Sequence, residues 1–415
     1  MTRVLLVCPE PLGHGQPAGI GIRFLEMANV LRANGHEVTL LSRDGGAVAG
    51  CAVGTITPRD LREGSERNDV AVVQGHVANE FVAHGRRIPL VIDLYDPFII
   101  ENLHYFAERG AEVFAHDHAT LIRSLLQGDV FLCASEAQRL FYLGILLAVG
   151  RLNPLAFERD PHFDSLLRIA PFGVQPPRRR ALRDLAEPAV LFGGIYDWYD
   201  PILAIEAVAV ARRELPGMTL TFTHHPNPGL TPQGKTAEAM EHVQRRGFDF
   251  VRFEPWVAYG RRGEFFDRFA LALLTFPRSI ETDLSMRTRV YDYLWGGLPI
   301  VTSSAPGTDE IIMRYGAGAI VGSESVTDFA QEIVRAVREN EVMAAGTTTF
   351  ALQHQWSRTL KPLLELVRDP RADLTKETFA ATPRLPERRP SFFRRLQRRA
   401  LAFRKATESG KWSTR

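Results

Sequence analysis

The chain has 415 residues, of which 45% are apolar and 24% charged, and its formal net charge at pH 7 is +2. This is the composition of an ordinary globular protein, and the length exceeds what one hydrophobic core usually covers, so two domains are expected. The three cysteines, Cys8, Cys51 and Cys133, are far apart and show no metal-ligand spacing. They indicate a reducing compartment and exclude a disulfide framework.

The sequence predicts neither a secretion signal nor a membrane-spanning segment. Met1 is followed directly by an apolar strand, residues 4–8, without a charged leader or a small-residue cleavage site. The longest apolar runs, residues 141–149 and 269–276, are much shorter than the roughly 20 residues that span a bilayer. We therefore expect a cytoplasmic protein.

Positive charge is concentrated at the C-terminus. Residues 384–415 hold eleven Lys and Arg against two Glu, a balance of +9, so the rest of the chain sums to −7. A mildly acidic body argues against nucleic acid as the main partner. From Pro390 onward, Phe and Leu recur at near-helical spacing between arginines, which predicts docking on an anionic membrane surface. A solvated, disordered terminus is the alternative.

Short apolar strands alternate with helical stretches from the start of the chain, which predicts a parallel sheet with helices on both faces. Strands are expected at residues 4–8, 36–42, 70–74, 89–93, 130–133 and 168–172. The loop after the first strand contains Gly19 and Gly21, and such glycines let backbone approach a phosphate or sugar closely. A plain strand-to-helix connection is the alternative. The loop matches neither the dinucleotide fingerprint nor the P-loop.

A proline- and arginine-rich stretch, residues 175–188, marks a linker, and a second alternation of strands and helices follows it. The expected fold class is α/β, with two Rossmann-like domains facing across a cleft. The expected parts are an N-terminal domain at 1–175, a second domain at 189–345, a helical segment at 346–380 and a basic tail at 381–415.

Two glycines, Gly193 and Gly194, end the first strand of the second half. Asp200 followed by Pro201 has the form of a helix start, with the aspartate as N-cap and the proline at the first helical position. Such a turn exposes backbone N–H groups to a diphosphate. A tightly turned structural connection is the alternative.

A cation occurs where a helix N-terminus disfavours it. Ser285 is placed to cap a helix, and Arg287 then lies in the first turn, which costs roughly 0.3 to 1 kcal/mol because the helix dipole is positive there. A donor diphosphate nearby would offset that cost. Pairing of Arg287 with Glu281 or Asp283 is the alternative.

Residues 281–301 combine an acidic loop, a short helix carrying an acid, a Gly-Leu-Pro turn and an apolar strand. This pattern resembles the donor-binding signature of family-4-like glycosyltransferases of the GT-B fold. Residues 35–38, 129–136, 225–228 and 307–310 add to the resemblance. It implies an N-terminal domain that faces the acceptor, with Gly19 and Gly21 in its loop, and a second domain that holds the nucleotide sugar.

The resemblance places several donor-binding residues. Asp292 stands where the family has a Glu that binds the donor ribose. Leu284 stands where a second Glu contacts the donor sugar, so that role is uncertain between Asp283 and Glu281. The first loop of the second domain lacks the usual Arg and Lys, and Arg287 and Arg289 are inferred to hold the diphosphate instead. The full expected donor set is Gly193, Gly194, His225, Asp283, Arg289, Asp292 and Glu310.

Asp96 is the candidate on the acceptor side, because relatives carry a functional His just beyond the strand that corresponds to 89–93. Its carboxylate can take a proton from an acceptor hydroxyl or orient that hydroxyl; an Asp-Pro turn is the alternative. The expected catalytic residues are Asp96, Arg287 and Glu281. No Asp-x-Asp triplet or zinc spacing occurs, so neither metal nor cofactor is expected, and fixed protein cations are expected to stabilise the leaving group.

The sequence thus predicts a glycosyltransferase that moves a sugar from a nucleotide diphosphate donor to a saccharide or lipid-linked acceptor in cell-envelope, surface polysaccharide or glycolipid synthesis. The resemblance implies retention of the anomeric configuration. Peripheral attachment to the inner face of the cell membrane is expected through the tail. Two alternatives stay open: a GT-B-shaped nucleotide-sugar epimerase, and a catalytically degraded scaffold protein that binds sugar nucleotides.

Overall fold

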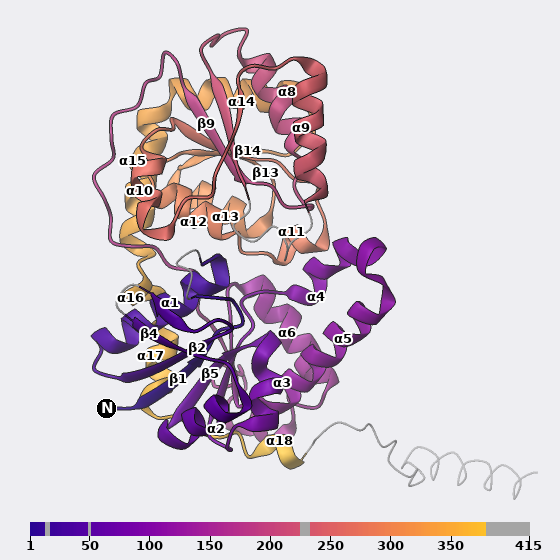
Figure 1. The fold of residues 1–415 in the computed structure, drawn as a ribbon, viewed down its shortest axis with the longest axis vertical. Coiled ribbons are helices and arrows are strands. Elements are labelled where there is room, and N and C mark those ends of the chain that lie inside the picture. Colours follow the sequence, from indigo (N-terminus) through magenta and orange to yellow (C-terminus); the bar gives the residue numbers. More distant parts are fainter. Residues whose placement is uncertain (13–16, 49–50, 225–232, 379–415) are drawn as a thin grey trace, which may run out of the picture. The chain divides into compact units, whose positions relative to one another are not determined.

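The protein is described by a computed structural model that covers residues 1–12, 17–48, 51–224 and 233–378. It contains two parallel-sheet lobes, an eight-stranded one built from the first half of the chain and a six-stranded one built from the second (Figure 1). We call them the first lobe (β1 to β8) and the second lobe (β9 to β14). The predicted α/β class with two Rossmann-like domains is confirmed.

The first sheet has the strand order β3-β4-β2-β1-β5-β6-β7-β8. All neighbours are parallel except the β3–β4 hairpin. The central strands are nearly continuous apolar runs because both sheet faces are covered. Its strands are β1 (Arg3–Val7), β2 (Glu37–Ser42), β3 (Gly46–Val48), β4 (Cys51–Thr55), β5 (Val70–Gln74), β6 (Leu90–Asp93), β7 (Val130–Cys133) and β8 (Leu167–Ile169).

Side-chain caps fix the starts of several first-lobe helices. Thr57, Ser135 and Asn153 each accept a hydrogen bond from a main-chain N–H of the first turn of α2, α6 and α7 respectively. The helices of this lobe are α1 (Gly19–Ala33), α2 (Pro58–Arg67), α3 (Gly75–His84), α4 (Phe98–Glu101), α5 (Phe106–Gln127), α6 (Glu136–Ala148) and α7 (Pro154–Arg159), with a 3-10 turn, η1 (Asn102–Tyr105).

The second sheet has the order β11-β10-β9-β12-β13-β14, and all its neighbours are parallel. The strand order reverses between β9 and β12, and open sheets of this kind bind ligands beyond the carboxyl ends of the strands at that point. Its strands are β9 (Ala189–Gly194), β10 (Thr219–Thr223), β11 (Val251–Glu254), β12 (Leu271–Leu274), β13 (Ile300–Ser303) and β14 (Gly318–Val321). The end of β9 is therefore the place to look for a site.

The predicted start of the first helix in this lobe is confirmed: Asp200 Oδ1 accepts a 3.0 Å hydrogen bond from Leu203 N, and Pro201 is the first helical residue. The helices are α8 (Pro201–Ala211), α9 (Gly234–Arg246), α10 (Arg262–Phe266), α11 (Ile280–Leu284), α12 (Thr288–Trp295), α13 (Pro306–Tyr315), α14 (Val326–Arg338) and α15 (Asn340–Gln353), with a 3-10 turn, η2 (Tyr259–Arg261).

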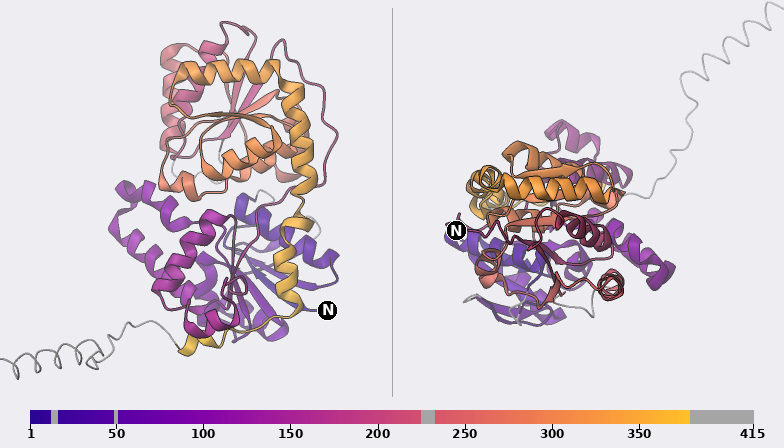
Figure 2. Two further views of the ribbon diagram at one scale, coloured as in Figure 1. Left: turned by 180° about the vertical axis from the view of Figure 1, so that it is seen from behind. Right: turned by 90° about the horizontal axis from the view of Figure 1, so that it is seen from above.

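After α15 the chain returns to the first lobe through α16 (Trp356–Thr359), α17 (Lys361–Arg368) and α18 (Thr375–Thr378), as the left view of Figure 2 shows. Arg168 pairs with Glu365 at 3.2 Å, and Asp373 N donates to Asp129 Oδ1 at 2.7 Å. The expected helical segment at 346–380 is thus divided, with α15 on the second lobe and α16 to α18 on the first. The tail at 381–415 lies outside the described residues.

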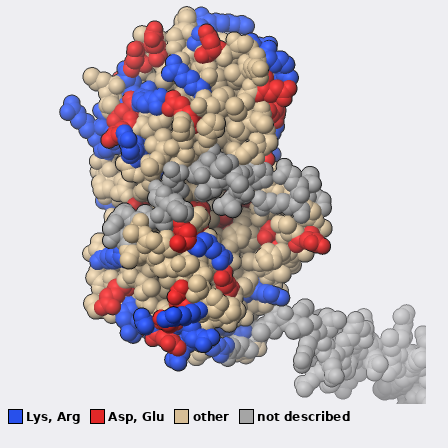
Figure 3. Space-filling model, viewed as in Figure 1, with Lys and Arg blue, Asp and Glu red and all other residues tan. Residues whose placement is uncertain are grey.

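Three strands were not predicted. β3, β4 and β14 are short and contain Gly or Ala, so they lack the β-branched run that marks a strand. Among the helices of the described residues, none is both long enough and apolar enough to span a bilayer. On the face drawn in Figure 3, basic and acidic side chains alternate over the described surface, and neither sign gathers into a continuous patch.

Candidate functional site

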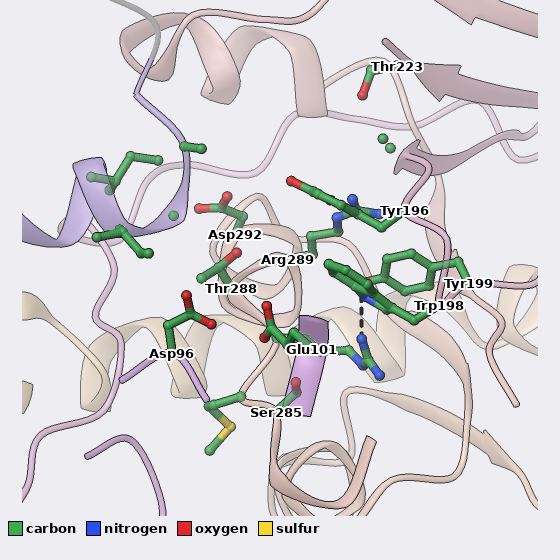
Figure 4. A pocket seen from close by; sticks show the side chains of 18 of the residues that line it. Asp96, Glu101, Tyr196, Trp198, Tyr199, Thr223, Ser285, Thr288, Arg289 and Asp292 are labelled. Atoms are coloured by element: carbon green, nitrogen blue, oxygen red, sulfur yellow. Dashed lines mark hydrogen bonds between the residues drawn. The ribbon is translucent and has the colours of Figure 1, made fainter. Parts of the chain in front are cut away.

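A cavity of about 390 Å³ lies at the carboxyl ends of the central strands of both sheets. Its walls come from the loops after β1 and β6 and from η1 in the first lobe, and from the end of β9, the segment before α10 and the α11–α12 region in the second (Figure 4). Its size suits a small-molecule ligand. Expected site residues among those that line it are Gly19, Asp96, Gly193, Gly194, Glu281, Arg287, Arg289 and Asp292.

At the end of β9, the main chain of two glycines lies beside the guanidinium group of Arg289. Gly193 has φ +85°, the left-handed region that favours glycine, and a Cβ there would collide with the Tyr293 hydroxyl. A Cβ on Gly194 would lie 3.4 Å from Arg289 Nη2. The two glycines therefore keep the backbone open beside the Arg289 side chain.

Arg289 is a half-buried cation that has no acidic partner among the described residues. Its guanidinium lies over the rings of Tyr196 and Tyr199, 4.9 and 4.6 Å from their centroids. Arg289 Nη1 is buried and has no hydrogen-bond partner, and no carboxylate of the described residues forms an ion pair with this side chain. A buried charge is costly unless it is paired. The site can therefore bind an anion between Arg289 and the Gly193–Gly194 turn.

Asp292, the residue expected at the donor ribose, is held by an arginine that the sequence analysis did not single out. Arg262 Nη1 lies 2.5 Å from Asp292 Oδ2. Burial raises the pKa of Asp292, and the charges of Arg262 and Arg289 oppose that rise. Trp256 lies beneath Arg262, 5.2 Å from ring centroid to guanidinium carbon, and its buried Nε1 has no partner. This end of the cavity offers a carboxylate, an aromatic ring and a free N–H.

Arg287 pairs with Glu281. Of the two explanations for a cation at this position, a bound diphosphate or an acidic neighbour, the structure shows the acidic neighbour. Arg287 Nη2 and Glu281 Oε2 are 3.0 Å apart, and their side chains are 3% and 1% exposed. Arg287 also donates to the Tyr199 hydroxyl at 3.3 Å. The expected role of Ser285 as a helix cap is wrong: α11 and α12 are separate helices, and Ser285 Oγ hydrogen-bonds to Glu281 at the end of α11.

The glycine loop of the first lobe is closed by a carboxylate. Glu10 Oε2 accepts a 2.8 Å hydrogen bond from Gly21 N at the start of α1, and burial raises the pKa of Glu10 to about 7. Gly19 lines the cavity, and a Cβ there would lie 3.2 Å from Thr288 Cγ2. Gly21 does not line it, because this glycine is needed for close packing against Glu10 and Leu12. The expectation for Gly21 is corrected accordingly.

Asp96 and Glu101 lie side by side on the first-lobe wall (Figure 4). Asp96 follows β6, and Glu101 is the last residue of α4. The two carboxyl groups are hydrogen-bonded to each other. Glu101 was not singled out from the sequence, since a single glutamate after an apolar dipeptide has no distinguishing pattern. Its only signal is its position five residues after Asp96.

Two other expected donor residues, Asp283 and Glu310, are not in the cavity wall. Asp283 lies 3.5 Å from Arg278 on the outer side of α11, and Glu310 is exposed on α13. Their donor roles stay predictions. On α11 successive side chains turn to different faces, and it is Glu281 rather than Asp283 that lines the cavity. His225 lies outside the described residues. Among the residues that the structure describes, no three His, Cys, Asp or Glu side chains gather as a metal site would require.

No protein-family model matches this sequence, and comparison with curated protein sequences also finds no match. Solved structures do resemble it. HepE of Anabaena, in complex with UDP-glucose, has a TM-score of 0.61 at 13% identity and covers 89% of this chain and 100% of its own. WaaG, a glycosyltransferase involved in lipopolysaccharide biosynthesis, has a TM-score of 0.59 at 15% identity and covers 87% and 98%.

TarM of S. aureus has a TM-score of 0.51 at 13% identity and covers 72% of this chain; the match spans 55% of the TarM chain. Identities this low establish likeness of fold. The likeness of these structures to the two parallel-sheet lobes of this chain confirms the architecture that the resemblance implied. The chain has the GT-B fold of the glycosyltransferases.

Proposed function

We propose that this chain is a glycosyltransferase that moves a sugar from a nucleoside diphosphate sugar to an acceptor hydroxyl. The observation that carries the proposal is Arg289, a half-buried cation beside the open Gly193–Gly194 backbone. Its buried Nη1 has no hydrogen-bond partner, and the side chain has no acidic partner among the described residues. This arrangement lies where the strand order reverses, and it fits a diphosphate. The structure of HepE with UDP-glucose supports the same ligand class.

The remaining groups of the second lobe suit the rest of such a donor. Asp292 keeps one carboxylate oxygen free of Arg262 and can accept a ribose hydroxyl, and Trp256 offers a ring and an N–H for a base. Arg289, with the Arg287–Glu281 pair behind it, would stabilise the negative charge that develops on the departing diphosphate. We propose that these protein cations do so without a metal ion and that the configuration at the transferred carbon is retained.

The acceptor and the place of action are proposed from one similar structure and from the charge of the C-terminal segment. WaaG acts in lipopolysaccharide biosynthesis, which favours a saccharide or lipid-linked acceptor of the cell envelope. The charge of +9 on residues 384–415 favours peripheral attachment to an anionic membrane surface from the cytoplasmic side. We propose family-4-like chemistry on the motif at residues 281–301.

A panel of radiolabelled UDP-, GDP- and ADP-sugars tests the proposal against its two alternatives. Release of the nucleoside diphosphate together with label in an acceptor supports a transferase. Isomerised donor would instead show an epimerase. Saturable binding without turnover would show a scaffold protein. If none of the donors binds, the transferase, the epimerase and the scaffold protein are all contradicted.

A further inference from the structure

Most charged side chains that line the cavity are paired with an opposite charge or with main-chain N–H groups, and two places in the wall are exceptions. Arg262 pairs with Asp292, Arg287 pairs with Glu281, and Glu10 accepts main-chain N–H groups of α1. Among the described residues, the remaining lining charges are Arg289 in the second lobe and the Asp96–Glu101 pair in the first. The proposed function assigns Arg289 to the donor, and it leaves Asp96 and Glu101 without a role as a pair.

Asp96 follows two residues, Asp93 and Tyr95, that are anchored by contacts with other parts of the molecule. Just before it, Asp93 at the end of β6 forms a fully buried ion pair with Arg23, at 2.8 Å. Tyr95 lies with its ring 4.7 Å from the guanidinium carbon of Arg23, and its hydroxyl donates to Met286 O. Glu101 reaches Asp96 because the short helix α4 turns the chain back over the loop. The main chain that carries Asp96 is thus anchored on its N-terminal side, and the short helix α4 brings Glu101 to it.

The pair holds a proton more readily than two separate, exposed carboxyl groups would, because the pKa of each group is raised. Burial raises the pKa of Glu101 well above its ordinary value of 4.5, and the charge of Asp96 raises it further. Burial also raises the pKa of Asp96, while the hydrogen bond from Glu101 lowers it. The hydrogen bond thus favours a protonated Glu101 that donates to an ionised Asp96. Other titratable groups that act on the pair are His76, Asp93, Glu281, Arg287, Glu10 and Tyr142.

A second observation indicates a ligand beside this pair. Arg287 lines the same cavity, is 6% exposed, and its charge acts on Glu101. Its Nε is buried and has no hydrogen-bond partner. An N–H left unpaired in a buried site costs free energy, which an oxygen atom of a ligand would recover. The cavity therefore presents an oxygen acceptor on Asp96 and an unused donor on Arg287 in the same region.

We propose that Asp96 and Glu101 act as one acid pair that carries a single proton and receives the acceptor hydroxyl, with Glu101 as the residue that positions Asp96. This proposal rests on the proposed function. The bond from the donor sugar carbon to the diphosphate oxygen breaks, and its electron pair leaves with the nucleoside diphosphate. The acceptor oxygen bonds to that carbon on the face that the diphosphate leaves, as the proposed retention requires. Its proton passes to the Asp96 carboxylate, which later releases it to water.

The pair works only while Glu101 is protonated. When Glu101 loses its proton, two carboxylates face each other and the hydrogen bond that positions Asp96 is gone. Activity should therefore fall at alkaline pH as Glu101 ionises. Glu101→Gln keeps a donor to Asp96 but has no proton to lose, so in this variant the fall should move by more than about one pH unit, since a one-unit shift corresponds to a tenfold change in the protonation equilibrium.

A substrate-free measurement separates the pair from the proposed function. The raised pKa means that folded Glu101 keeps its proton at a pH where the unfolded chain has lost it, so the free energy of unfolding falls as pH rises above about 4.5. Glu101→Gln abolishes that contribution. The melting temperature of this variant should therefore rise relative to the wild type with increasing pH.

The experiment compares wild type, Glu101→Gln, Glu101→Ala, Asp96→Asn and a control, Glu136→Gln, whose carboxylate is 62% exposed on α6. Melting temperatures are measured from pH 5 to 9, together with UDP release from UDP-glucose with water and methyl glucosides as acceptors. We expect Asp96→Asn to lose about 100-fold or more in turnover and Glu101→Ala to lose a similar factor. Glu101→Gln, which still donates to Asp96, should lose less than Glu101→Ala, and the control Glu136→Gln should keep the wild-type turnover.

A melting-temperature difference between Glu101→Gln and wild type that does not change with pH would overturn the shared proton. A pH-dependent difference with an unchanged pH profile of turnover would overturn the acceptor role. Absence of binding of every UDP-, GDP- and ADP-sugar to the wild type would instead contradict the proposed function, on which the acceptor role depends, while the melting data still report on the pair.

Discussion

The hydroxyl of Tyr95 donates a 2.8 Å hydrogen bond to the main-chain carbonyl of Met286. Tyr95 belongs to the loop after β6 in the first lobe, and Met286 lies between α11 and α12 in the second. Gln138 adds to this connection, because its Nε2 donates to the carbonyls of Tyr95 and Leu284, each at 3.0 Å. The two walls of the cavity are thus joined by polar contacts at the position of the proposed chemistry.

Replacing Tyr95 by Phe should weaken the alignment of the two walls. The ring still packs on Arg23, and only the hydrogen bond to Met286 is lost, at a cost of about 1 kcal/mol. We expect kcat/KM to fall about fivefold, since 1.4 kcal/mol corresponds to a factor of ten. Steady-state kinetics and a thermal melt measure the two effects. A large loss of stability with unchanged kinetics would show that the bond serves folding alone.

Gly193→Ala should damage both stability and donor binding. An alanine at φ +85° costs about 1 to 2 kcal/mol, and its Cβ would displace the Tyr293 hydroxyl from Phe192 O, which it now meets at 2.7 Å. Thermal unfolding and UDP titration measure the result. Gly322→Ala is the matched control, because a Cβ there meets no atom within 4 Å and its stability should change by less than about 0.5 kcal/mol. Equal effects of the two changes would contradict the strained turn.

Arg23→Met should destabilise the first lobe strongly. Arg23 and Asp93 are 0% and 1% exposed, and removal of one partner leaves the other as an uncompensated buried charge, which typically costs about 3 to 5 kcal/mol. Arg335→Met is the control: its pair with Glu332 is exposed, and such pairs contribute about 1 kcal/mol or less. Chemical denaturation compares the two variants. Similar stability of both would mean that the buried pair is dispensable.

Local chemistry explains what could be predicted from the sequence. Asp200-Pro201 predicts the start of α8, because the aspartate caps the first turn and the proline fixes the backbone angle φ at the first helical position. The anomaly at Arg287 was also visible, but its partner was not decided, since both Glu281 and a diphosphate satisfy the same charge. Only the separate helix α11, capped by Ser279, brings Glu281 to Arg287.

Contacts between distant segments explain what could not be predicted. Arg262 meets Asp292 across 30 positions, and α10 and α12 must both form before the two are neighbours. Glu101 faces the cavity only because α4 follows the Asp96 loop. The sequence left the acid that contacts the donor sugar open between Asp283 and Glu281. The turn of the short helix α11 places Glu281, and not Asp283, in the cavity wall. A pattern of residue types contains none of this geometry.

Deletion of residues 381–415 should reduce membrane attachment. This segment holds eleven Lys and Arg with interspersed Phe, and each cation near an anionic surface contributes about 1 kcal/mol. Co-sedimentation with vesicles containing phosphatidylglycerol should fall on deletion, while turnover of soluble acceptors stays unchanged. Neutral phosphatidylcholine vesicles are the control. If the shortened protein sediments as the full chain does, another part of the molecule binds the membrane.

The most direct test of the account is the affinity for UDP of the wild type and of Arg289→Met, measured by calorimetry. Arg289 is the cavity cation that has no acidic partner among the described residues, and its buried Nη1 is unpartnered. A hydrogen bond to a charged group contributes about 1.5 to 3 kcal/mol, so the affinity should fall about 10- to 100-fold. Arg268→Met, at a surface pair with Glu254, should bind as the wild type does. Saturable UDP binding that is equal in all three proteins would contradict a diphosphate at Arg289.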